Sequence, residues 1–364
     1  MLNFNTICSN KPNLNDAAID IFKQLSKIDK LVKITVFVAG NTDKELHSCK
    51  QIIDTIWQQV GSQRKIRINL VAQKPLNCSL SAEYVSYEGN GILHYKQEEG
   101  VDVVEIDEAG NRVILLNGIN DKNAETLEEQ AETIFQKSSE ILKQNNFSYK
   151  HIVRQWNYIP SILAASDEKQ NYQVFNDIRS NTYNLVNWTS GYPAATGIGV
   201  AGTRLSIDLI AVDGFGLRTI TNPDQIDAHI YSNKVLENGC LSTRTTPKFE
   251  RAKLLETATE SLLFVSGTAA IEGEDSHEAE VSRQTELTLQ HIHSLCQLAV
   301  PEGEKELKTS DVRLLRAYIK HTDDYERVER ICRDKYPEAP IICVKADVCR
   351  DELLVEIEAF VKTH

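Results

Sequence analysis

The residues with the clearest potential for chemistry lie near the end of the chain, in CVKADVCRDELLVEIEAFV from Cys343 to Val361. Glu356 is surrounded there by branched apolar residues. A carboxyl group that loses water in such a setting has a raised pKa and can act as a general acid at neutral pH. Cys349 lies seven residues earlier. The alternatives are a solvated carboxylate on an edge strand and a small core cysteine.

The elements that must position these residues form a repeated pattern. VILLNGI at Val113–Ile119 and LLFVSGTAAI at Leu262–Ile271 are each followed by a long helical run, a strand, a short helix and two strands. Between the two copies, Gly118 aligns with Gly267, Tyr158 with Tyr318, and Asp208 falls close to Glu356. Residues 31–100 contain a similar order of elements, so a third and more divergent copy is possible.

This order predicts an α+β fold built from tandem units, with helices packed on one face of mixed or antiparallel sheets. Apolar residues at helical spacing, such as Ile134, Phe135, Ile141 and Leu142, support the packing. We expect an N-terminal region at 1–105, a second unit at 106–215, a connection at 216–250 and a C-terminal catalytic unit at 251–364. Long connections often line functional sites, so 216–250 is expected to do so.

Composition narrows the class of protein. The chain has 364 residues, of which 41% are hydrophobic and 25% charged, and its formal net charge is -12. Such a chain lacks the basic surface that nucleic-acid binding requires, and no apolar run approaches the roughly 18 residues of a membrane span. The eight cysteines form no metal-binding pattern, so no metal is expected. Scattered cysteines are typical of a reducing cytoplasm.

A set of motifs gives these observations a more specific meaning. RQWNYIP, YQVFN, YPAATGIG, TPKFERA, FVSGTAAIEG and ADVCRDELLVEIE occur in this order between residues 150 and 360. This set resembles the chorismatase family, whose chains are built from YjgF/RidA-like units. The resemblance implies that the protein cleaves chorismate, releases pyruvate, and uses no metal or organic cofactor. One branch of the family adds water, and another forms a hydroxybenzoate.

The resemblance also assigns roles to residues. The catalytic glutamate of the family falls at Glu356, which would protonate the enolpyruvyl group. Cys349 and Gly267 stand where the branch that forms 3-hydroxybenzoate has them, and the thiol would assist proton transfer. Gly267 has a backbone alternative, since a glycine in a strand often marks a bulge.

Chorismate carries two carboxylates, for which arginine forks are the best partners. We expect Arg154, Arg204 and Arg251 to bind them, with Tyr158 and Tyr318 as hydrogen-bond donors. Further arginines at suitable places are Arg179, Arg244 and Arg316. For each arginine alone, the alternative is a surface ion pair.

The sequence therefore predicts a cofactor-independent chorismatase that forms 3-hydroxybenzoate and pyruvate. Two alternatives stay open: a hydrolytic chorismatase that yields a dihydroxycyclohexadiene acid, and a non-catalytic protein that binds a metabolite. Tandem units can satisfy within one chain the interfaces that single units form by assembling, so a monomer is expected.

Overall fold

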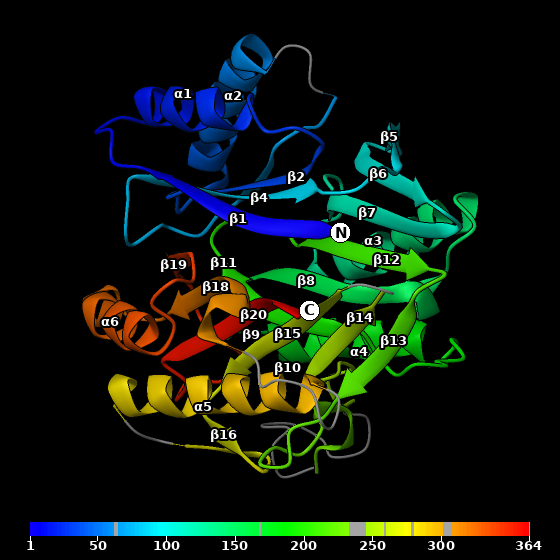
Figure 1. Cartoon of the computed structure of the whole chain (residues 1–364). Coiled ribbons are helices and arrows are strands. Elements are labelled where there is room, and N and C mark those ends of the chain that lie inside the picture. Colours follow the sequence, from blue (N-terminus) through cyan, green and yellow to red (C-terminus); the bar gives the residue numbers. More distant parts are fainter. Residues whose placement is uncertain are drawn as a thin grey trace.

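Three sheets, each with two helices on one face, organise the chain in the computed structural model (Figure 1). The structure describes residues 1–61, 65–166, 169–232, 245–257, 260–277, 280–300 and 308–363. Within these ranges, no helix combines the length and the apolar character needed to cross a membrane. The expected α+β class with mixed sheets is confirmed.

The first unit contains β1 (Leu2–Ser9), α1 (Leu14–Leu25), β2 (Leu31–Phe37), α2 (Asp43–Val60), β3 (Asn69–Val71) and β4 (Leu80–Tyr87). The second contains β5 (Ile92–Glu98), β6 (Val101–Glu108), β7 (Asn111–Asn120), α3 (Leu127–Gln144), β8 (Ile152–Pro160), α4 (Asn171–Tyr183), β11 (Ala194–Val200) and β12 (Ser206–Asp213). A short hairpin, β9 (Ala165–Ser166) with β10 (Lys169–Gln170), precedes α4.

The third unit contains β13 (Gly216–Ile220), β14 (Ala252–Glu256), β15 (Ser261–Ala269), α5 (Val281–Ala299), β18 (Val312–Ile319), α6 (Tyr325–Lys335), β19 (Ile341–Lys345) and β20 (Val355–Thr363). The hairpin of β16 (Ile271–Glu272) and β17 (Asp275–Ser276) precedes α5.

The three units share one topology. The strand orders β1-β4-β2-β3, β7-β12-β8-β11 and β15-β20-β18-β19 are the same arrangement three times. In each, the last strand lies between the first two, and the third strand runs parallel to the second. The N-terminal unit thus has the same topology, but it extends from β1 to β4 and not over residues 31–100, because its first strand is β1 and the strands after residue 91 pair into the second sheet.

The unit boundaries differ from the expected ones. Strands β5 and β6 pair into the second sheet, so the second unit begins near residue 92 and not at 106. Strand β13 pairs with β14, so 216–220 belongs to the third sheet and not to a connection. Part of the expected connection, 233–244, lies outside the described residues.

Each helix pair covers the outer face of its own sheet. In α3 the apolar residues expected to face the sheet, Ile134, Phe135, Ile141 and Leu142, are all buried. The helix begins at a capping box between Thr126 and Glu129, which satisfies backbone donors that have no partner within the helix. Amphipathic spacing and a capped start together place α3 on its sheet.

The inner faces of the three sheets meet in a common core. Phe4 of the first unit stacks on Phe360 of the third, with ring centroids 4.0 Å apart, and Trp156 of the second unit lies 6.0 Å from Phe360. Three ion pairs between side chains that are at most 1% exposed also join the units: Lys33–Asp208, Arg154–Glu358 and Arg316–Glu83.

Strand pairing corrects one alignment made from the sequence. Glu356 pairs in register with Tyr318, and the residue that pairs with Tyr158 is Ser206, not Asp208. Asp208 is the counterpart of Glu358, two residues further along the strand. The alignment of Gly118 with Gly267 is confirmed, because both glycines lie at the irregularity of the first strand.

Candidate active site

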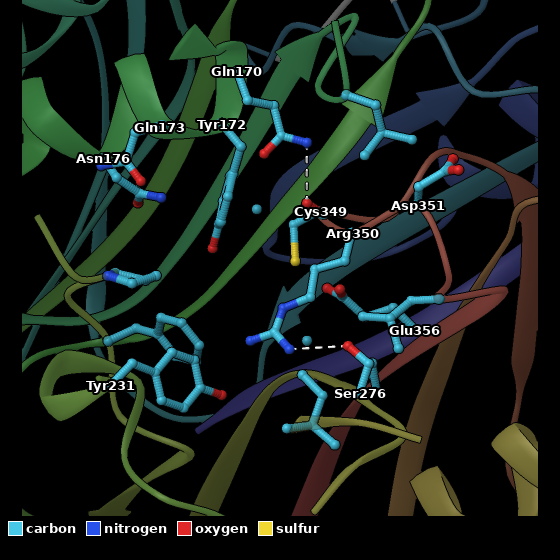
Figure 2. A pocket seen from close by; sticks show the side chains of 18 of the residues that line it. Gln170, Tyr172, Gln173, Asn176, Tyr231, Ser276, Cys349, Arg350, Asp351 and Glu356 are labelled. Atoms are coloured by element: carbon cyan, nitrogen blue, oxygen red, sulfur yellow. Dashed lines mark hydrogen bonds between the residues drawn. The ribbon is translucent and has the colours of Figure 1, made fainter. Parts of the chain in front are cut away.

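A cavity of about 530 Å³ lies where the second and third units meet. The second unit contributes α4, β11 and the hairpin before α4 to its wall. The third unit contributes β15, β20 and the turn at 349–353. Tyr231, Pro247 and Phe249 also line the cavity, and Figure 2 shows Tyr231 on the side opposite Asp351. The site is therefore assembled from parts of the chain that are distant in sequence.

Glu356 lines this cavity from β20. The strand is central, between β15 and β18, so the alternative of an edge strand is wrong. The side chain is only 5% exposed. Burial and, after it, the carboxylate of Glu358 raise the pKa of the Glu356 carboxyl to about 8, although Arg154 and Arg251 act in the opposite direction. The carboxyl is thus protonated at neutral pH and can donate its proton.

Gly267 makes room for that carboxyl group. It lies on β15 at a break in the pairing with β20, between Val265 and Thr268. A Cβ atom on Gly267 would overlap Oε1 of Glu356 and come within 3.0 Å of Thr196 Cγ2. The glycine therefore serves both as a bulge residue and as space for the acid.

Cys349 lies in the turn before β20, and its side chain faces the same space as those of Arg350 and Glu356 (Figure 2). Burial raises the pKa of the Cys349 thiol to about 12, and Glu356, which is ionised at the high pH where the thiol titrates, adds to this effect. The group is therefore a neutral thiol at physiological pH, and its chemistry is that of a weak donor and a shape-filling side chain rather than a nucleophile.

Three arginines bring positive charge to the cavity wall: Arg179, Arg251 and Arg350. Among the described residues, none of them has a carboxylate within ion-pair distance. Arg179 on α4 is 2% exposed, donates to Oδ1 of Asn176 at 2.5 Å, and has a buried Nε without a partner. A buried guanidinium without a counterion is an expensive arrangement unless an anion joins it.

The other two arginines are held by neutral partners. Arg251, which is 3% exposed, donates to the carbonyl oxygen of Ile226 and to the hydroxyl of Tyr231, and its Nε also lacks a partner. Arg350 donates to Oγ of Ser276 at 2.9 Å and to a backbone carbonyl oxygen. Their charges remain available to anionic groups in the cavity.

Three predicted binding residues lie behind the cavity wall. Arg154 is fully buried and pairs with Glu358 at 2.6 Å. Tyr318 donates to Glu358 at 3.0 Å, and the hydroxyls of Tyr158 and Tyr318 accept hydrogen bonds from Arg316. These side chains are not on the cavity surface, so their predicted contact with substrate is corrected to support of the strand that carries Glu356.

Arg204 lies elsewhere. Its side chain is exposed and donates to the carbonyl oxygen of Ala124 at 2.7 Å, away from the cavity. The prediction that it binds substrate is not supported by this placement, because the turn before β12 faces solvent. Arg244 lies outside the described residues.

Sequence reasoning did not favour Arg179 or Arg350 and did not single out Tyr172. Tyr172, Asn176 and Arg179 all line the cavity and occur at helical spacing in NYQVFNDIR. That spacing places them on one face of α4 and was the available signal. Gly197 leaves room for the Tyr172 ring, since a Cβ there would lie 3.0 Å from Cε2.

The described residues contain no group of three or more His, Cys, Asp or Glu side chains that could hold a metal ion. Instead, the cavity is lined by three guanidinium groups, the Cys349 thiol and four carboxyl groups. Glu356 is the carboxyl with a raised pKa, and Asp275, Asp351 and Glu352 are the others. Such a set can bind a small molecule with more than one anionic group and protonate it.

The fold as a whole matches that of a solved protein. A solved chorismatase crystal structure matches the chain with a TM-score of 0.71, over 99% of both chains, at 20% identity. The chain thus has the fold of a chorismatase. Residues 87–211 also match the family model described as "Chorismatase FkbO/Hyg5-like, N-terminal".

Two relatives with known names are also similar to this chain in sequence. A 3-hydroxybenzoate synthase of Streptomyces hygroscopicus is 31% identical over 235 residues, which cover 61% of this chain and 66% of the relative. A chorismatase of Streptomyces rapamycinicus is 31% identical over 223 residues, or 58% of this chain and 64% of the relative. The chain thus matches these relatives over somewhat less than two thirds of their length. The resemblance to chorismatases is confirmed.

Proposed function

We propose that the protein cleaves chorismate to 3-hydroxybenzoate and pyruvate. The observation that carries the proposal is the neutral carboxyl of Glu356 facing a cavity that also holds three arginines without carboxylate partners among the described residues. Chorismate has two carboxylates and an acid-sensitive enol ether, which are the groups that such a site can bind and protonate. The names of the similar proteins point to the same substrate.

Two anion positions follow from the arginines. Arg179 comes from α4 of the second unit, whereas Arg251 and Arg350 come from the third unit. A carboxylate at Arg179 would give its buried guanidinium the counterion it lacks, and the second carboxylate would contact Arg251 or Arg350. Glu356 and Cys349 line the same cavity and would act on the part of the substrate between them.

The reaction begins when Glu356 transfers its proton to the methylene carbon of the enolpyruvyl group. The electron pair of the double bond forms the new C–H bond and leaves an oxocarbenium ion. The neighbouring ring hydroxyl then attacks the ring carbon that bears the ether oxygen and gives its proton to the Glu356 carboxylate. The ring C–O bond breaks, its electron pair stays on the oxygen of the leaving group, and pyruvate is released. The resulting epoxide opens, and a proton leaves the ring carbon and is returned to oxygen, which gives the aromatic hydroxybenzoate. Hydroxybenzoate and pyruvate together contain all the atoms of chorismate, so no water is consumed.

Cys349 favours the formation of hydroxybenzoate over the addition of water. Its neutral thiol occupies space beside Glu356 from which an attacking water must be excluded, and it can exchange a proton with the ring during aromatisation. Gly267 leaves the Glu356 carboxyl in place beneath the enolpyruvyl group. We assign the choice of product to these two residues.

Incubation with chorismate tests the proposal directly. Chromatography and mass spectrometry should detect 3-hydroxybenzoate and pyruvate in equal amounts. A dihydroxycyclohexadiene acid as the main product would instead establish the hydrolytic reaction. Binding of chorismate without any product would establish the non-catalytic alternative.

We also propose that the protein is a cytoplasmic monomer. Three units of one topology already surround a common core within one chain, which supports a monomer. The seven described cysteines are all free, as expected in a reducing compartment. Light scattering at several protein concentrations gives the mass, and a constant mass of twice the chain would contradict the proposal.

A further inference from the structure

The three structurally equivalent acidic residues of the core differ in what lies beside them. Glu83, Asp208 and Glu358 each lie on the last strand of their unit, and each pairs with a cation of another unit. The residue two positions earlier on the strand is Ser81, Ser206 and Glu356, respectively. Of these three positions, Glu356 in the third unit is therefore the one that carries a titratable side chain, and this side chain faces the cavity.

Glu358 is held as a carboxylate by an unusually complete set of donors. Arg154 and Thr196 Oγ1 each lie 2.6 Å from Oε2, Tyr318 donates at 3.0 Å, and Trp156 Nε1 donates to Oε1 at 3.0 Å. Burial alone would raise its pKa, but the charges of Arg316 and Arg154 outweigh burial and hold the pKa of Glu358 below its ordinary value. The negative charge is thus permanent.

The same contacts connect Glu358 to the acid. Side chains two residues apart on a strand lie on the same face, so Glu356 and Glu358 are neighbours on β20. Thr196 of the second unit lies between them, because its hydroxyl contacts Glu358 and accepts a hydrogen bond from the Gly267 backbone at 3.0 Å. Gly267 in turn borders the Glu356 carboxyl.

We infer that Glu358 is a positioning residue whose buried negative charge keeps the Glu356 carboxyl protonated and available to the substrate. The inference rests on the proposed function and deepens it. Glu358 also anchors the second unit through Arg154 and Thr196, so one carboxylate both joins two units and prepares the acid between them.

Other charged and titratable groups also surround Glu356. Arg154 on β8 and Arg251 before β14 favour its ionised form, whereas Glu358 on β20 opposes it. Cys349 in the turn and Tyr172 on α4 interact with it as neutral groups whose own pKa values are raised. Tyr318 on β18 is its partner across the strands. The cavity wall adds further charged groups: Arg179, Arg350, Asp275, Asp351 and Glu352. Among the acidic groups, Glu358 is the one whose charge raises the pKa of Glu356.

The test is the pH dependence of kcat/KM for chorismate in Glu358→Gln. Wild-type activity should fall as the pH rises through about 8, where Glu356 loses its proton. Without the charge of Glu358, and with Arg154 left uncompensated, this descending limb should move to lower pH by about one to three units. An unchanged limb would overturn the inference.

Asp208→Asn is the matched control. It removes the equivalent buried carboxylate, which pairs with Lys33 and has Ser206 in place of the acid. This variant should lose stability in a similar way but keep the descending limb where the wild type has it. A shift of equal size in Asp208→Asn would show that the effect is structural, and the inference would fall.

A second variant tests the inference in case Glu358→Gln does not fold. Arg154→Met combined with Glu358→Gln removes both members of the buried pair, and Arg316 keeps its partner Glu83. The limb should again move to lower pH, though less, since Glu358 affects Glu356 more strongly than Arg154 does. A limb that stays or moves to higher pH contradicts the inference.

Infrared spectroscopy separates this inference from the proposed function. The carboxylic-acid band that disappears in Glu356→Gln should persist at neutral pH in the wild type and weaken in Glu358→Gln. If chorismate is not converted but the band is present in the wild type and weaker in Glu358→Gln, the proposed function fails and the inference stands. If chorismate is converted but the band is unaffected by Glu358→Gln, the inference fails alone.

Discussion

At the scale of single residues, the site depends on keeping one carboxyl neutral while its neighbour stays charged. Glu356 and Glu358 have the same side chain and lie two residues apart on one strand. They differ in partners: Glu358 receives hydrogen bonds from Arg154, Thr196 and Trp156, whereas no described residue donates one to Glu356. Environment rather than residue type therefore separates the acid from the structural carboxylate.

The first prediction concerns Glu356 itself. Glu356→Gln keeps the size of the side chain but removes the transferable proton, so kcat should fall by about 10²- to 10⁴-fold. Because the pKa of Glu356 is about 8, the wild type should be active below this pH and lose activity above it. Steady-state kinetics between pH 5 and about 10 check both points. Undiminished turnover in the variant would remove Glu356 from the mechanism.

The second prediction concerns the product. In Gly267→Ala the new methyl group takes the place of Glu356 Oε1, so the carboxyl must turn away and turnover should slow. In Cys349→Ala the lost thiol leaves room for a water molecule beside the acid. We expect both variants to release a larger share of the dihydroxycyclohexadiene acid, measured by liquid chromatography. Hydroxybenzoate alone from both would contradict the roles of these residues.

At the scale of elements, helix α4 and strand β20 come from different units and face each other across the cavity. Strand β20 carries the acid, and α4 carries Tyr172, Asn176 and Arg179 at the spacing of one helix face. The hairpin of β16 and β17 adds Ser276, which fixes Arg350. Glu356 and Arg179 are therefore held by separate elements of different units, and no ion pair joins them.

The third prediction concerns Arg179 on α4. Arg179→Met should raise KM for chorismate by about 10- to 100-fold, the loss of one to three kcal/mol typical of a charged hydrogen bond. Arg204→Met is the control, because Arg204 is exposed and lies away from the cavity. Equal KM values for Arg179→Met and the wild type would show that Arg179 does not bind a carboxylate.

At the scale of the whole molecule, three units of one topology surround a core in which each contributes one buried acid. The pairs Lys33–Asp208, Arg154–Glu358 and Arg316–Glu83 link the three units in a closed ring. Asp208 also accepts hydrogen bonds from Asn69 and the Gly118 backbone, and Glu358 accepts them from Thr196, Tyr318 and Trp156. Oε1 of Glu83, by contrast, is buried without a partner among the described residues. Removing one member leaves a buried charge without its partner.

The fourth prediction tests this ring. Lys33→Met should lower the free energy of unfolding by about 3–5 kcal/mol, because Asp208 would stay buried without its cation. The double variant Lys33→Met with Asp208→Leu should recover much of this loss, since no charge remains. Chemical denaturation followed by circular dichroism gives both values. Equal stability of Lys33→Met and the wild type would mean that the pair contributes nothing.

Some features of this protein were determined by local sequence. The amphipathic helices, the repeated order of elements and the apolar setting of Glu356 all depend on residues within a short segment, so spacing was enough to predict them. Gly267 and Cys349 line the same cavity as Glu356, and all three residues lie within one unit.

Other features were decided only by tertiary structure. Which arginines face the cavity depends on how the second unit docks on the third, and sequence spacing carries no information about that contact. Arg204 and Arg179 looked alike in sequence, yet one faces solvent and the other is buried in the cavity wall. The neutral state of Glu356 likewise depends first on its burial and then on the charge of Glu358, which Arg154, Thr196 and Trp156 of another unit hold in place. Both conditions exist only once the units have met.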